Sequence, residues 1–242
     1  MVKPPDLGTV LIVGVGTGLG AALARRFASA GSPVAIGARS EGAVTEIAEG
    51  IRGGGQRALA IPYDATNAEA VAAAIDRAER ELGPIGTLIY NAGNAARGGV
   101  EQVALDAFEA AWRVGPYGAF LHARILVPKM RDRGFGAVLL SGATSSVRAP
   151  AHSIAFGSAK FGLRGLAMSL SREVAKEGVH VAHILLDGAI RTPRAASYLA
   201  LGEPALEPQE IAETYYRVAV QPPSVWTFEL DMRPMGDDLM DN

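Results

Sequence analysis

The sequence predicts an α/β fold in which helices cover both faces of one doubly wound parallel sheet. Three observations support this prediction. Short apolar segments alternate with longer segments of helical period, the apolar segments show little polar alternation, and no linker divides the 242 residues. A chain of this length suits one large domain over 1–242, and 49% hydrophobic residues suffice for a sizeable core.

The expected elements follow one another in regular β-α order, each strand being a short apolar run. The expected strands are 9–13, 33–37, 57–61, 87–90, 136–140 and 179–186. The expected helices are 18–29, 41–52, 67–82, 105–130 and 153–177. Gly115-Pro116 should break the fourth helix, because proline lacks an amide donor. Gly53-Gly54-Gly55 is interpreted as a helix stop. About seven strands are expected in all.

The last part of the chain departs from this rhythm. A substrate loop or lid is expected over about 188–222, irregular up to residue 204 and helical from 208 to 220. A final edge strand is expected at about 224–230. The acidic tail, with Asp237, Asp238 and Asp241, should fray.

Composition excludes several classes of function. A net charge of −2 argues against a nucleic-acid partner, which needs a basic face. The absence of cysteine excludes disulfides and thiolate metal sites, and no carboxylate–histidine cluster suggests another metal site. No run is long enough to span a membrane, and no signal segment is apparent at the start. We therefore expect a cytoplasmic protein without membrane or metal.

A glycine-rich turn follows the first expected strand and opens directly into a helix. It comprises Gly14, Gly16, Thr17, Gly18, Leu19 and Gly20. Glycine lets the backbone approach a pyrophosphate closely, and a helix N-terminus offers amide donors to it. This position predicts a Rossmann-type dinucleotide site. The spacing is Gly-x-x-x-Gly-x-Gly rather than the commoner Gly-x-Gly-x-x-Gly.

With three further motifs, this spacing resembles the short-chain dehydrogenase/reductase family from about Thr9 to Thr192. Asn91-Ala92-Gly93 resembles the family motif that supports the sheet and lines the cofactor cleft. Asp64, with Ala65 beside it, stands at the position of the adenine-contacting aspartate. The segment that contains Gly188, Ile190 and Thr192 is similar to a family motif that begins with proline, where this chain has Asp187. The resemblance implies a nicotinamide dinucleotide cofactor.

The end of the second strand distinguishes the two nicotinamide dinucleotides. NAD binders of this fold place a carboxylate there to accept from the ribose 2′-hydroxyl. This chain has Ala38 followed by Arg39, and a guanidinium can bind a 2′-phosphate with two hydrogen bonds. NADP(H) is therefore favoured over NAD(H), with Arg39 as an ordinary solvated residue the open alternative.

Most of the family's catalytic residues are replaced. The resemblance implies Tyr-x-x-x-Lys on a helix, yet the chain has Phe156 four residues before Lys160, which removes the proton-donating hydroxyl. Ala143 stands where the family has serine, and Gly115 where it has asparagine. Lys160 remains, and the resemblance implies that it binds the nicotinamide ribose.

Other polar residues are candidate substitutes for the lost acid. Thr144 and Ser145 flank Ala143, while His152 and Ser153 precede the helix that carries Phe156, and Tyr117 begins another helix. Histidine has a suitable pKa for acid–base work. His122, His180 and His183 are interpreted as structural.

Three functions remain open. The favoured one is an atypical NADP(H)-dependent oxidoreductase on a small apolar substrate, because the cofactor motifs are present and the segment 189–202 is expected to form a lid. The alternatives are a non-catalytic NADP(H)-binding sensor or interaction protein, and a non-redox lyase, hydratase or cyclase. The apolar helices at 105–130 and 153–177 further predict a homodimer or homotetramer.

Overall fold

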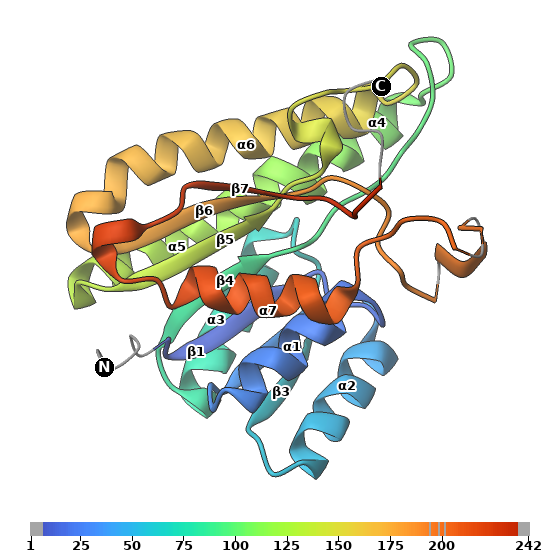
Figure 1. Ribbon diagram of the computed structural model, residues 1–242. Coiled ribbons are helices and arrows are strands. Elements are labelled where there is room, and N and C mark those ends of the chain that lie inside the picture. The colour runs from blue at the N-terminus through green and yellow to red at the C-terminus, as the bar shows by residue number, and fades with distance from the viewer. Residues whose placement is uncertain (1–6, 194, 198, 201, 237–242) are drawn as a thin grey trace.

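Seven parallel strands form one sheet within the residues that the computed structural model describes, which are 7–193, 195–197, 199–200 and 202–236 (Figure 1). The strand order is β3-β2-β1-β4-β5-β6-β7. The strands are β1 (Thr9–Val13), β2 (Val34–Ala38), β3 (Ala58–Pro62), β4 (Ile85–Tyr90), β5 (Gly136–Ser141), β6 (Val179–Leu186) and β7 (Glu229–Met232). The predicted doubly wound α/β fold is confirmed.

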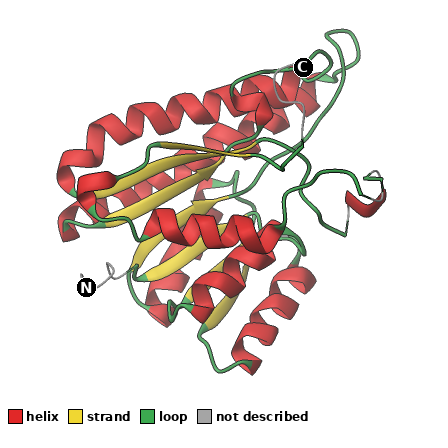
Figure 2. Ribbon diagram, in the orientation of Figure 1, coloured by secondary structure: helices red, strands yellow, loops and turns green. Residues whose placement is uncertain are grey.

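Helices cover both faces of the sheet, as Figure 2 shows. The α-helices are α1 (Leu19–Ser29), α2 (Glu41–Gly53), α3 (Ala68–Leu82), α4 (Leu105–Trp112), α5 (Gly118–Arg133), α6 (Ile154–Val174) and α7 (Pro208–Ala219). Buried residues of α1, α2 and α7 form one core with the sheet, and those of α3, α5 and α6 form a second core on its opposite face. Because both faces are covered, β1, β4 and β6 are buried along their whole length.

Local sequence explains where several elements begin and end. The Asn67 side chain accepts from the Ala70 amide at 2.8 Å and caps the start of α3. Helix α2 ends at the triple glycine, where Gly55 has a φ of 84°. Between α4 and α5 a π-turn spans Arg113–Tyr117, and Gly115 leaves helical geometry with a ψ of −106°. The predicted helix stop and the predicted break are both confirmed.

The predicted final strand at 224–230 is wrong in its position. Residues Pro223–Val225 form a 3₁₀ turn, and pairing with β6 begins only where His183 faces Glu229. The reason is local: the Gln221 side chain binds both the amide and the hydroxyl of Thr227, which holds this segment in a turn.

The predicted lid over 188–222 is also too long. Its last part is α7, whose Tyr215 is completely buried. The hydroxyls of Tyr215 and of Ser141 in β5 share a hydrogen bond of 2.7 Å. The Arg26 guanidinium of α1 lies 3.7 Å from the ring centroid of Tyr216. This helix is thus part of the covering layer, and only the segment before residue 208 is loop-like. The predicted acidic tail, Asp237 to Asp241, lies outside the described residues.

Candidate functional site

The glycine turn between β1 and α1 lies at the carboxyl edge of the sheet. Gly14 has a φ of 85°, and a Cβ added there would stand 2.4 Å from the backbone nitrogen of Ala92. The side-chain amide of Asn91 donates to the Gly14 carbonyl at 3.1 Å. The predicted turn and the Asn91-Ala92-Gly93 motif therefore support one another directly, at a distance that only glycine allows.

The start of α1 is open to an anion. Gly18 precedes the helix without a side-chain cap, and no acidic residue occupies its first turn. A Cβ at Gly18 would stand 2.5 Å from Cγ2 of Thr192, and one at Gly20 would stand 2.6 Å from Cα of Val15. Because Gly18 offers no capping side chain, the first helical amides remain as donors for a phosphate group.

A cleft of about 360 Å³ opens beside this turn. Its wall includes these predicted residues: Gly14, Gly16, Ala38, Arg39, Asp64, Ala65, Asn91, Ala92 and Gly93. The remaining predicted cofactor residues are not part of its wall: Thr17, Gly18, Leu19, Gly20, Lys160, Gly188, Ile190 and Thr192. Thr17 is exposed in the turn and Leu19 is buried at the helix start, whereas Ile190 bridges to Leu206 beyond Gly188.

Two exposed polar side chains, Arg39 and Asp64, line the cleft. Arg39 is exposed and makes no side-chain hydrogen bond or ion pair with any other described residue. Asp64 is exposed too, and one of its carboxylate oxygens accepts from the Thr66 amide at 2.8 Å. The guanidinium of Arg39 and the second oxygen of Asp64 are therefore accessible to a ligand.

Lys160 lies beneath the cleft. Its side chain is buried, its Nζ donates to the Ser141 carbonyl at 2.7 Å, and a Cβ built on Gly93 would stand 3.7 Å from that nitrogen. The same Nζ lies 5.6 Å from the ring centroid of Phe156. Burial lowers the pKa of Lys160 to about 8, because it disfavours the charged form. The lysine and the aromatic ring are thus brought together as predicted.

The two other replaced positions offer no side-chain donor. Ala143 begins a short 3₁₀ turn, Thr144–Ser146, and its backbone amide donates to the Ser146 hydroxyl. A Cβ built on Gly115 would stand 3.5 Å from the Cβ of Ala159, so the backbone at the π-turn packs closely against α6. With Phe156, three positions at this site therefore carry no group that can donate a proton.

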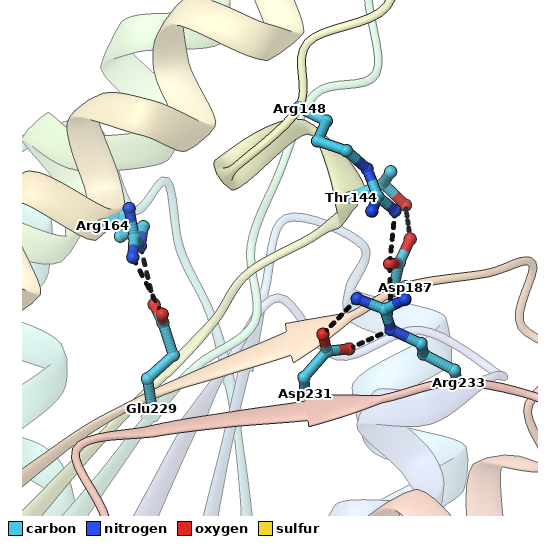
Figure 3. A network of polar contacts seen from close by, with 7 residues as sticks. All are labelled: Thr144, Arg148, Arg164, Asp187, Glu229, Asp231 and Arg233. Atoms are coloured by element: carbon cyan, nitrogen blue, oxygen red, sulfur yellow. Dashed lines mark hydrogen bonds and ion pairs between the residues drawn. The ribbon is translucent and has the colours of Figure 1, made fainter. Parts of the chain in front are cut away.

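The hydroxyl of Thr144 binds the carboxylate of Asp187. This hydroxyl donates to Oδ1 of Asp187 at 2.6 Å, while Arg148 donates to Oδ2 at 2.7 Å (Figure 3). Arg233, which also pairs with Asp231, lies 3.3 Å from the same Oδ2. Since Asp187 is buried, these contacts compensate its charge. The one hydroxyl proton of Thr144 is thus engaged by this carboxylate.

This network was not predicted, although its central residue was visible as an aspartate in place of proline. The partners come from the segment after β5, the end of β6 and the segment after β7, which are far apart in sequence. Figure 3 also shows a second contact, in which Arg164 of α6 binds both carboxylate oxygens of Glu229 at 2.7 and 2.9 Å. Together they attach the C-terminal strand to the site.

The other candidate donors differ in their surroundings. His152 is exposed and has a φ of 60°, which is strained for a residue other than glycine, and its carbonyl accepts from the Gly98 amide. Ser145 and Ser153 are buried. Tyr117 is 41% exposed at the end of the π-turn. His152 and Ser153 thus stand where the loop after β4 meets the start of α6.

The three remaining histidines are buried. His122 binds the Tyr63 hydroxyl at 2.7 Å, and burial lowers its pKa to about 4. Burial also lowers the pKa of His180 and His183, whose partners are the Thr227 carbonyl and Glu229. They are neutral near pH 7, which agrees with the structural role expected for them.

Two features of the described part of the chain bear on other functions. No three or more histidine and carboxylate side chains gather there in a way that would hold a metal ion. No helix in it combines the length and the apolar character that a bilayer span requires.

Comparisons with known proteins agree with this geometry. The model of the short chain dehydrogenase family matches residues 8–200. Ketoacyl reductase HetN of Nostoc is 27% identical over 72% of this chain, which spans 60% of that relative's length. The uncharacterized oxidoreductase YxbG of Bacillus subtilis is 31% identical, over 76% of this chain and 67% of its own.

Solved structures of the same fold cover nearly the whole chain. A short-chain dehydrogenase from Rhodopseudomonas palustris is 31% identical with a TM-score of 0.82, over 95% of this chain and 100% of its own. A metagenomic short-chain oxidoreductase, solved in complex with NADP, is 23% identical with a TM-score of 0.83, over 95% of this chain and 97% of its own.

Proposed function

The chain belongs to the short-chain dehydrogenase/reductase family, and from that premise we propose that it is an atypical NADP(H)-dependent oxidoreductase acting on a small apolar substrate. One observation carries the proposal: Gly14, Arg39, Asp64 and the Asn91-Ala92-Gly93 motif line one cleft, while Phe156, Ala143 and Gly115 lack the family's donors. A cofactor of this class supplies or accepts a hydride when it is bound.

The residues present fit a dinucleotide. Gly14 admits the backbone of Ala92, and Gly18 admits the methyl group of Thr192, where a Cβ would collide. The uncapped start of α1 suits a pyrophosphate. Asp64 is available for an adenine amino group. Lys160 has no carboxylate partner among the described residues, so ribose hydroxyls would satisfy the donors that Ser141 leaves free.

The preference for NADP(H) rests on Ala38 and Arg39. Ala38 removes the carboxylate that would repel a 2′-phosphate, and the exposed guanidinium of Arg39 lines the same cleft. Solved structures of this fold hold NADP or NADH, so the fold itself accommodates either dinucleotide and the choice rests on these two residues.

The missing hydroxyl points to the class of substrate. Reduction of a carbonyl leaves an alkoxide that needs a proton, and Phe156 has no hydroxyl to donate it. Addition of a hydride to an iminium carbon yields a neutral amine without any proton. Reduction of an activated C=C bond places the proton on carbon, where water can deliver it. We therefore favour these two acceptor classes over ketones.

A paired variant tests the proposal. Phe156→Tyr with Ala143→Ser restores a phenol near Lys160 and a hydroxyl beside it. We expect carbonyl reduction to rise about 100- to 10,000-fold, followed as loss of the reduced-nicotinamide absorbance. A panel of iminium and enone substrates should be reduced by the native chain. Absence of turnover in both experiments would contradict an oxidoreductase.

A second candidate function is a dinucleotide-binding protein without turnover. The engagement of Thr144 by Asp187 favours it, because this nearby hydroxyl is then not free to replace the acid. This candidate requires NADP(H) binding and a partner whose affinity depends on the cofactor. Retained cofactor binding without reduction of any substrate class would select it.

We also propose that the chain forms a homodimer or homotetramer through the helices α4 to α6. Four aromatic side chains on these helices and the turn between them are 40–44% exposed: Trp112, Tyr117, Phe120 and Phe161. An apolar surface of this kind is costly in water unless a second subunit covers it. Light scattering tests the state, and Phe120→Glu should shift it toward the monomer.

A further inference from the structure

A polar cluster joins the last strand to the helix that carries Lys160. Arg164 of α6 binds both carboxylate oxygens of Glu229 at 2.7 and 2.9 Å (Figure 3). The same carboxylate accepts from Nδ1 of His183 at 2.9 Å, and these two residues are register partners of β6 and β7. Arg164 follows Lys160 by about one helical turn. The ion pair therefore fixes α6 close to the lysine.

The ring of His183 is completely buried and lies against the end of β5. A Cβ built on Gly142 would stand 2.4 Å from Nε2 of this ring, so only glycine lets the ring lie there. The Gly142 amide donates to the Ile184 carbonyl of β6 at 2.7 Å. The histidine thus fills the side-chain space of Gly142 and holds the strand end in place.

The strand end that His183 contacts is also the one that binds Lys160. The Ser141 carbonyl accepts from Nζ of Lys160 at 2.7 Å, and the described residues provide no further hydrogen-bond partner for this nitrogen. The Ser141 hydroxyl shares a hydrogen bond of 2.7 Å with Tyr215 of α7. Since α6 and α7 cover opposite faces of the sheet, Tyr215 and His183 fix two successive residues of β5 from opposite sides.

The cluster itself is not placed to act on a substrate. His183 has no exposed surface, and burial lowers its pKa, so the ring is neutral near pH 7. The carboxylate of Glu229 is 28% exposed and is already engaged by Arg164 and His183. Neither group replaces the lost acid, and an effect on the site must pass through the residues that they contact.

We propose that Glu229 and His183 are positioning residues for Lys160, because they fix the helix that carries the lysine and the carbonyl that it binds. Glu229 acts on the helix through Arg164, and His183 acts on the Ser141 carbonyl through the neighbouring glycine. The proposal deepens the proposed function by naming the residues that hold the cofactor-binding lysine, and it rests on that function for its effect on NADPH affinity.

Two substitutions that preserve charge test the proposal. His183→Asn keeps a donor for Glu229 but leaves the space over Gly142 unfilled, and Arg164→Lys keeps the charge but loses the paired hydrogen bonds. NMR of ¹³Cε-labelled lysine follows Lys160, one of four lysines, with Lys160→Met for assignment. Burial lowers the pKa of Lys160 to about 8 in the native chain. Both variants should raise it by about one pH unit, because the amine gains access to water. An unchanged titration of Lys160 in both would overturn the proposal.

A double-mutant cycle separates positioning from a general loss of structure. His183→Asn should weaken NADPH binding about fivefold in the native chain and have no further effect in Lys160→Met, because its effect passes through the lysine. An equal loss in both backgrounds would contradict a positioning role.

The matched control is Arg131→Met, which removes an ion pair with Glu177 beyond the far end of α6. It should leave the Lys160 titration and the NADPH affinity unchanged. If the native chain binds no NADPH, the proposed cofactor fails, whereas the titration of Lys160 still decides whether His183 and Arg164 position it.

Discussion

Thr144 donates its hydroxyl proton to the buried carboxylate of Asp187 at 2.6 Å, and this contact joins the segment after β5 to the end of β6. The other carboxylate oxygen binds Arg148 and lies near Arg233. An aspartate at this position thus holds together three segments that are distant in sequence, where the family pattern has proline. The cost of burying its charge is offset by three partners.

Replacement of this carboxylate should destabilise the chain. We expect Asp187→Ala to lower the free energy of unfolding by about 2 kcal/mol, because charged partners lose hydrogen bonds and remain partly buried. The control is Asp231→Ala, which removes a more exposed partner of Arg233 and should cost about 0–1 kcal/mol. Urea unfolding measures both, and equal losses would show that the Asp187 network is not stabilising.

Substitution of Gly16 should affect cofactor binding without affecting the stability of the fold. A Cβ built there has no protein atom within 4 Å, so Gly16→Ala should leave the melting temperature almost unchanged. The same Cβ stands in the cleft wall beside the pyrophosphate position. NADPH affinity should therefore fall about tenfold, or about 1.4 kcal/mol. Gly42→Ala, also in open space but outside the cleft, serves as control; unchanged affinity in both would place the phosphates elsewhere.

Arg39 should determine the choice of dinucleotide. Loss of a charge-assisted contact to the 2′-phosphate costs about 1.5–3 kcal/mol. Arg39→Ala should accordingly weaken NADPH binding about tenfold or more while NADH binding stays the same, and Ala38→Asp should reverse the preference. Calorimetric titration with both cofactors measures the ratio. An equal loss for NADPH and NADH would contradict a role in 2′-phosphate recognition.

Burial of Lys160 makes stability depend on pH in a defined window. Its pKa is about 8 in the folded chain and 10.5 as the ordinary value, so the unfolded chain binds more protons between those values. Stability should therefore rise from pH 8 to about 10.5, by about 3 kcal/mol in all. Urea unfolding of Lys160→Met should lack this rise, and an identical pH dependence in both proteins would contradict the assignment.

Much of the fold follows from local sequence. Runs of apolar residues locate the strands to within two residues for β1 to β6, and Gly115-Pro116 locates the break before α5. The cleft residues are equally predictable, because glycine spacing and the strand ends place them together.

Long-range contacts could not be predicted in this way. The start of β7 depends on how Gln221 binds Thr227, and the buried carboxylate of Asp187 depends on Arg148 and Arg233 from distant segments. A cavity of about 830 Å³, lined in part by His180 and Trp226, arises only where the starts of β4, β5 and β6 meet the end of α7. Composition and period carry no information on such pairings, which the tertiary structure alone defines.

The most direct test of the central claim, that the dinucleotide cleft is intact although the acid is lost, is a calorimetric titration of the native chain with NADPH. The account predicts saturable binding of one NADPH per chain, weakened by Gly16→Ala and by Arg39→Ala. No heat of binding at saturating NADPH and NADH would contradict it, and both proposed roles of the cleft would then fail.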